Sequence, residues 1–140
     1  MVRIRSTRER GSMTAELVIL APVFALFVMM CIGLGRYELV RMQVVDAARA
    51  GADAASVVAS PGEASGAAQS AAVAPLQGEQ HACPDPTVAA DTADFVPGGS
   101  VAVSVHCTVS FSDLLVPGLP GTVTISSTQR DPVDPYRVVQ

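Results

Sequence analysis

Two pairs of cysteine and histidine are the residues in this sequence with the most evident chemistry. His81 lies two residues before Cys83, and His106 lies directly before Cys107. Together the four side chains could bind a zinc ion, whereas the two cysteines alone could form a disulfide outside the cytoplasm. Neighbouring residues of a strand point to opposite faces of a sheet, so His106 and Cys107 would need a bulge to meet at one ion. We therefore expect a Cys83–Cys107 disulfide and no metal; closing a loop of about 25 residues would stabilise the fold by roughly 3 kcal/mol.

No pattern typical of an active site accompanies these residues. The sequence has no nucleophile-elbow glycine pattern and no phosphate-binding loop. Its serines occur where caps, strands and loops are expected. A third cysteine, Cys31, lies in an apolar run and is interpreted as a small apolar residue. We expect no enzymatic activity, no cofactor and no small-molecule substrate.

A further candidate functional residue is Glu16, a single carboxylate at the start of a long apolar run. From Leu17 to Gly35 there are 19 residues without a charge, which as a helix would span about 28 Å, close to the hydrocarbon thickness of a bilayer. Burying an ionised carboxylate there costs about 2–3 kcal/mol unless a cationic group pairs with it. The apolar run supplies no cation. A cut immediately before Ser12 would supply one, because the new α-amino group would lie four residues from Glu16.

Charge is distributed unevenly along the chain. Residues 1–11 carry four arginines against Glu9, a net charge of +3, so the remainder carries −7 within the total of −4. The chain contains no lysine, and the net charge of −7 after Gly11 argues against nucleic-acid binding through a basic face. Three further arginines follow the apolar run at positions 36, 41 and 49, so the positive-inside rule sets the orientation only weakly.

The apolar run is expected to continue as one helix from near Thr14 to about Ala59. No A-x-A cleavage motif follows Gly35, which argues against a cleaved secretory signal. Beyond Gly35 the apolar residues recur at helical spacing and form a stripe of Tyr37, Val40, Val44, Ala48, Gly51 and Ala55. Small residues on this stripe would allow close approach by another helix or by the protein's own globular part.

Helix and strand signals follow in order. Ser60, Pro61 and Glu63 form a helix start signal, and the second helix is expected to end near Ala74. Residues 101–111 alternate strictly between apolar and polar, residues 122–128 are rich in β-branched side chains, and residues 87–95 form a weaker strand candidate. The fold class is therefore α+β: a long N-terminal transmembrane and amphipathic helix, a short second helix and a small antiparallel sheet of two or three strands.

These signals divide the chain into five expected segments. They are a basic leader at 1–11, the transmembrane and amphipathic helix at 12–59, a short helix and linker at 60–80, a small extracytoplasmic β module at 81–130 and an extended tail at 131–140.

Three stretches of the sequence resemble a known family. The basic leader ending in Gly11, the small Ser12, Glu16 and the apolar run are similar to the class III signal of type IV pilin-like proteins. The stretches RGSMTAELVILAPVFALFVM, VVDAARAGADAAS and VDPYR more closely resemble TadE-like pseudopilins of tight-adherence (Flp-type) pilus systems. The resemblance implies that a membrane-embedded prepilin peptidase cuts after Gly11, that Ser12 becomes the mature N-terminus, and that Glu16 acts in processing or assembly.

The resemblance also implies partners and a location. The partners would be the membrane, the prepilin peptidase, other pilins and the assembly machinery, with the N-terminus cytoplasmic and the β module outside. Leu17 follows the glutamate where major pilins often carry tyrosine, and the sheet is additional, which favours a minor pseudopilin. Two alternatives stay open: an uncleaved single-pass envelope protein whose exported β module binds a partner, and a secreted enzyme or metal-binding module.

Overall fold

A computed structural model of the chain describes residues 10–77, 83–114 and 120–136, and of residues 10–16 and 113 it describes the backbone alone. A long helix, α1 (Arg10–Ser56), is followed by α2 (Pro61–Val73), a 3-10 turn η1 (Ala74–Gln77), the strands β1 (Thr87–Asp91) and β2 (Ser100–Ser110), a short helix α3 (Phe111–Leu114) and β3 (Thr122–Pro132). The predicted α+β class, with a long helix, a short helix and a small antiparallel sheet, is confirmed.

The second helix begins as its sequence signal indicates. The Ser60 hydroxyl oxygen accepts a hydrogen bond from the Glu63 backbone N–H at 3.3 Å, and Pro61 occupies the first turn. This cap satisfies one of the backbone donors that a helix start leaves without a partner. Three alanines spaced four residues apart, Ala64, Ala68 and Ala72, are buried, so α2 presents a flat face to the rest of the fold.

The sheet is a three-stranded antiparallel meander in the order β1-β2-β3. The central strand β2 carries the alternation seen in the sequence. Its odd-numbered side chains are buried: Val101, Val103, Val105, Cys107 and Val109. On the opposite face the pairs Ser104–Thr128 and Thr108–Thr124 join neighbouring strands through hydroxyl hydrogen bonds of 2.8 and 3.3 Å. One face of the sheet is therefore apolar and the other polar.

The third strand is longer than the sequence indicates. It was expected to end at Thr128, but it pairs with β2 as far as Pro132. Phe111 N–H donates to the Gly121 carbonyl and Val133 N–H to the Gly99 carbonyl, so the odd-numbered residues of β3 bond to β2. Pro132 is even-numbered, and the N–H that it lacks would have pointed to the open edge of the sheet. An edge strand tolerates a proline at such a position.

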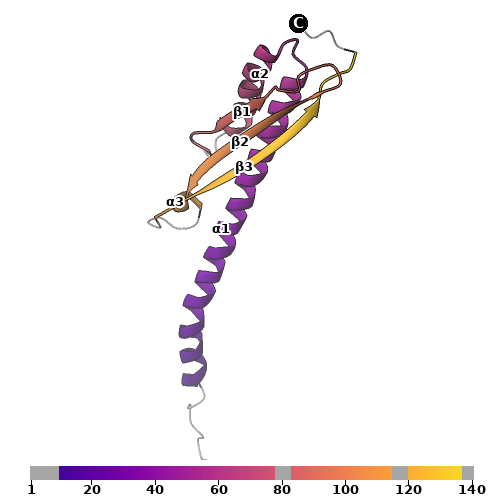
Figure 1. Ribbon diagram of the computed structural model, residues 1–140. Helices are drawn as coiled ribbons and strands as arrows, with labels where there is room; N and C mark the ends of the chain where they lie inside the picture. The colour runs from indigo at the N-terminus through magenta and orange to yellow at the C-terminus, as the bar shows by residue number, and fades with distance from the viewer. Residues whose placement is uncertain (1–9, 78–82, 115–119, 137–140) are drawn as a thin grey trace, which may run out of the picture.

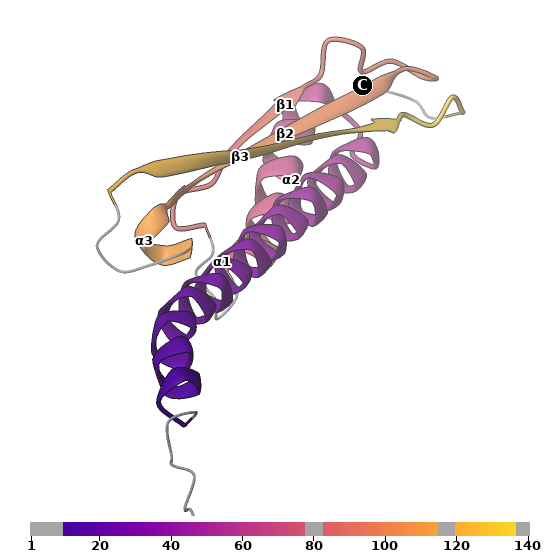
Figure 2. The same ribbon diagram turned by 90° about the horizontal axis from the view of Figure 1, so that it is seen from below.

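Helices α1 and α2 cover the apolar face of the sheet. Figures 1 and 2 show α2 and the C-terminal part of α1 packed against the sheet, while the N-terminal part of α1 extends away from it. Gly51 lies at the closest approach, because a Cβ built there would meet Val103 Cγ1 at 3.0 Å, the Ala68 carbonyl oxygen at 3.1 Å and Ala72 Cβ at 3.2 Å. Small side chains on both helices let this core form with few aromatic residues.

Candidate membrane anchor and processing junction

The candidate processing residues lie in the first two turns of α1. The helix begins at Arg10, about four residues before the expected start near Thr14, so the backbone of Gly11 and Ser12 is already helical. Ser12 and Glu16 are four residues apart, which places them on the same side of the helix and about 6 Å apart along its axis. Leader residues 1–9 lie outside the described residues.

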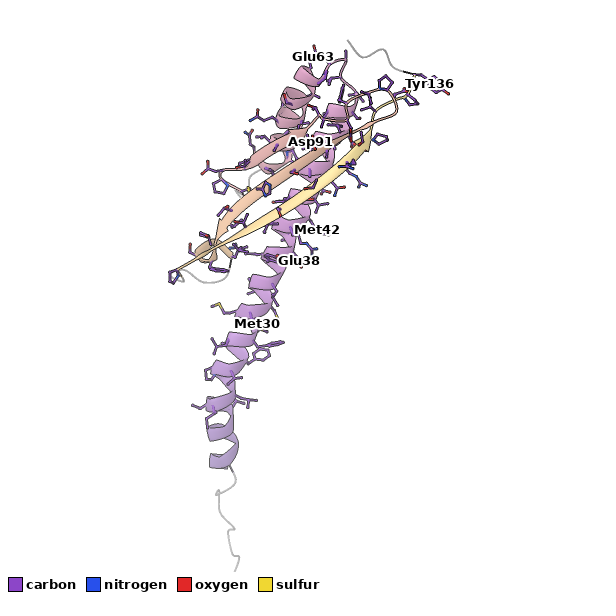
Figure 3. The ribbon with its side chains drawn as sticks, viewed as in Figure 1. Met30, Glu38, Met42, Glu63, Asp91 and Tyr136 are labelled. Carbon is purple, nitrogen blue, oxygen red and sulfur yellow. A yellow bond between two sulfur atoms is a disulfide. The ribbon has the colours of Figure 1, made fainter. Side chains whose placement is uncertain are left out.

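Residues 17–35 of α1, here called the anchor half, expose apolar side chains on every side. Leu17 is 71% exposed and Leu26 is 72% exposed. The other large apolar residues of this half are also exposed: Val18, Ile19, Leu20, Val23, Phe24, Phe27, Val28, Met29, Met30, Ile32 and Leu34. Met30 lies on α1 beyond the end of the sheet in Figure 3. By length and composition, the described part of α1 is able to cross a membrane.

Pro22 does not interrupt the anchor half. The helix is continuous from Arg10 to Ser56 with Pro22 inside it. Proline removes one backbone hydrogen bond, which membrane helices tolerate. The anchor half therefore joins the junction at Gly11 and Ser12 to the rest of α1 without a break. Cys31, a free cysteine, is exposed among the apolar side chains of this half.

Residues 37–56, here called the domain half, bury one stripe of α1. Val40, Val44, Ala48, Gly51 and Ala55 are buried and Tyr37 is half-buried. The stripe packs in the same core as α2 and β2. The sequence left open whether another helix or the protein's own globular part would occupy this stripe, and the structure places the protein's own elements there.

An acidic pair joins α1 to β3 near the end of the domain half. The pKa of Asp131 is raised above its usual value, chiefly by a hydrogen bond with the Asp53 side chain. Partial burial and the charge of Asp53 raise that pKa further, whereas the Arg49 guanidinium lowers it. Asp53 lies four residues after Arg49, so their proximity on one helix can be predicted from the sequence. Asp131 lies 78 positions after Asp53, and only the tertiary fold shows that the two acids are neighbours.

The two cysteines of the domain are joined as the sequence predicted. Cys83 and Cys107 form a disulfide with a Cα–Cα distance of 5.6 Å, which ties the segment before β1 to the central strand. Because both sulfur atoms take part in this disulfide, neither is a zinc ligand. His106 is exposed on the opposite face of β2, and His81 lies outside the described residues. Over residues 10–77, 83–114 and 120–136, no group of three or more potential metal ligands gathers.

The end of the sheet nearest the anchor half was not anticipated. There Phe111, the last residue of the predicted strand at 101–111, instead begins α3. The Phe111 ring packs against the backbone of Gly121, where a Cβ would lie 2.7 Å from the ring. Gly121 has a φ of +128°, a conformation that other residues rarely adopt. The Pro120-Gly121 pair is the available signal in the sequence, but it does not indicate that a helix precedes it.

Comparison with known proteins bears on the same helix. Residues 11–53 match the family described as TadE-like protein. The matched segment covers the processing junction, the anchor half and most of the domain half, and the predicted resemblance is confirmed over it. No curated protein and no solved structure matches the chain.

Proposed function

We propose that this chain, with its TadE-like segment at residues 11–53, is a minor pseudopilin that takes part in assembling a tight-adherence pilus used in adhesion. The observation that supports the proposal most is the contrast along α1. An anchor half with apolar side chains on all sides continues without a break into a helix that is built into a disulfide-bonded domain. Such a chain can be held in a bilayer before it is moved into a pilus.

Processing forms the second part of the proposal. A prepilin peptidase cuts after Gly11 on the cytoplasmic side and leaves Ser12 as the N-terminus. Because positions 12 and 16 share one side of α1, the new amine and the Glu16 carboxylate can pair within one subunit or between neighbours. Pairing offsets the cost of an ionised carboxylate at the edge of the hydrocarbon layer. The protein has no catalytic role in this account.

The domain keeps its own core during assembly. Since the stripe from Val40 to Ala55 is buried against α2 and β2, contacts with other subunits use the anchor half and the exposed side of α1. That side carries Leu39 and Met42, which are 57% and 63% exposed. The polar face of the sheet stays outside the membrane as an interaction surface.

Substitution of Glu16 tests the proposal in cells that assemble the pilus. Glu16→Ala is expected to reduce the number of pili strongly, because the amine of Ser12 loses its partner. Glu38→Ala is the matched control: Glu38 is an exposed acid of the same helix, paired with Arg41 at 3.6 Å, and lies beyond the apolar run. Normal pilus number and length in Glu16→Ala cells, at equal protein level, would exclude the assembly role of this carboxylate.

A further inference from the structure

The distance between the end of the anchor half and the start of the domain is very short. Gly35 is the last residue of the uncharged run. Tyr37 is half-buried against the core, and Val40 is 7% exposed. At about 1.5 Å per residue, Tyr37 lies about 3 Å and Val40 about 7.5 Å beyond Gly35 along the helix axis. The domain therefore begins within two helical turns of the apolar run.

If the anchor half crosses the bilayer, no stretch of helix separates the domain from the headgroup layer. The 19 residues of the anchor half span about 28 Å, which matches a hydrocarbon core of about 30 Å with no residues to spare. The headgroup region on each side adds about 5–8 Å. If the anchor half crosses the bilayer, Tyr37 and Val40 lie at headgroup depth. A tilt of the helix would bring one side of the domain still closer to the lipid.

The end of the domain that contains α3 lies close to the anchor half. In both views of the ribbon, α3 is the part of the domain nearest to the anchor half (Figures 1 and 2). Leu114 of α3 is buried in the shared core, whereas Ser112 and Pro120 are exposed. The packing of Phe111 on Gly121 fixes the position of this end relative to the sheet.

We propose that Tyr37, Phe111, Ser112 and Pro120 form a lipid-contact surface that lies in the headgroup layer of the bilayer spanned by the anchor half. Tyrosine is favoured at this depth, since its ring is apolar and its hydroxyl reaches water. The contact follows from the short stretch of helix between Gly35 and the domain, so it does not depend on the charge of the lipids. This inference rests on the membrane anchoring in the proposed function.

Single tryptophans can test the contact, because the chain contains none. The full-length protein is reconstituted in phosphatidylcholine vesicles that contain lipids brominated in the upper acyl chain, which quench nearby indole fluorescence. Ser112→Trp and Pro120→Trp place the probe on the proposed surface. Tyr136→Trp is the matched control, because Tyr136 is 95% exposed and lies at the opposite end of the sheet (Figure 3). Phe27→Trp reports on the anchor half itself.

The expected result is about twofold quenching at Phe27→Trp and at one or both surface probes, with Tyr136→Trp little affected. Two probes are used so that a local disturbance by one substitution does not decide the outcome. If Phe27→Trp is quenched while Ser112→Trp and Pro120→Trp behave like Tyr136→Trp, the lipid contact is excluded and the anchoring stands. If Phe27→Trp is not quenched, the anchoring and the proposed function fail together.

Discussion

The two halves of α1 belong to one helix but cover their apolar side chains in different ways. In the domain half, Val40, Val44 and Ala48 are buried by α2 and β2, and the exposed side carries charged residues together with Leu39 and Met42. In the anchor half no side of the helix is polar, and of residues 17–35 only Gly33 is buried. One continuous helix therefore changes its apolar pattern from a full circle in the anchor half to a single buried stripe in the domain half.

Charges placed in the two halves should have very different effects, and this is the largest effect we expect. Phe24→Arg combined with Phe27→Arg would cost about 6 kcal/mol of membrane insertion, taking about 3 kcal/mol for each arginine. The matched control is Leu39→Arg combined with Met42→Arg, which has the same spacing on an exposed side of the domain half. Carbonate-resistant membrane association should be lost in the first variant and kept in the second. Equal retention of both would contradict the division of α1.

Loss of the disulfide should affect the domain half alone. Cys83→Ser combined with Cys107→Ser removes a cross-link between residues 24 positions apart, and the free energy of unfolding of the domain should fall by about 3 kcal/mol. Membrane association through the anchor half should be unchanged. Thermal unfolding in detergent measures the first effect and membrane fractionation the second. An unfolding temperature equal to that of the native chain would show that the bond does not support this small core.

Glycine-to-alanine substitutions should differ in sign between the halves. Gly51→Ala places a Cβ within 3.2 Å of Val103, Ala68 and Ala72, and the crowding should outweigh the gain in helix propensity, for a net loss of about 1 kcal/mol. Gly35→Ala meets no atom within 4 Å and should leave the domain's stability equal or slightly higher. Denaturant unfolding of both variants measures the difference. A stabilising Gly51→Ala would contradict the close packing of α1 on the domain.

The smallest expected effect concerns the acidic pair of Asp53 and Asp131. Because the folded-state pKa of Asp131 is raised, its contribution to stability is present below its unfolded pKa and is lost as pH rises through the folded pKa. Asp131→Asn keeps a hydrogen-bond donor beside Asp53 at every pH. The variant should be more stable than the native chain at pH 7, by well under about 1 kcal/mol because the site is largely solvent-exposed. Unfolding measured from about pH 4 to pH 7 should lose part of its pH dependence; an unchanged profile would show that the two carboxyl groups do not interact.

Local patterns predicted much of this fold, and tertiary contacts account for what they missed. The alternation in β2 and the stripe on α1 are visible because each repeats with the period of its own element, and the Ser60 cap is visible because its signal lies within four consecutive residues. The extension of β3 to Pro132 depends on which side of an edge strand lacks a partner, which the sequence does not show. The proximity of Asp53 and Asp131, likewise, arises only when β3 lies beside α1.

The candidate site also has features that local sequence predicts and features that only the tertiary structure shows. The order Gly11, Ser12, Glu16 and an apolar run is local, so the junction could be proposed from sequence. The covering of the stripe by α2 and β2 and the position of α3 beside α1 required the tertiary structure. Small residues on a helix stripe indicate close packing but not the identity of the packing partner.

The mass of the protein's N-terminal segment tests the central proposal most directly. The full chain is expressed with an active prepilin peptidase and, in parallel, without it, and Gly11→Val serves as a variant that should resist the cut. We expect a chain that begins at Ser12 only when the peptidase and Gly11 are both present. A chain that still begins at Met1 or Val2 beside the active peptidase would contradict it and would favour an uncleaved single-pass envelope protein.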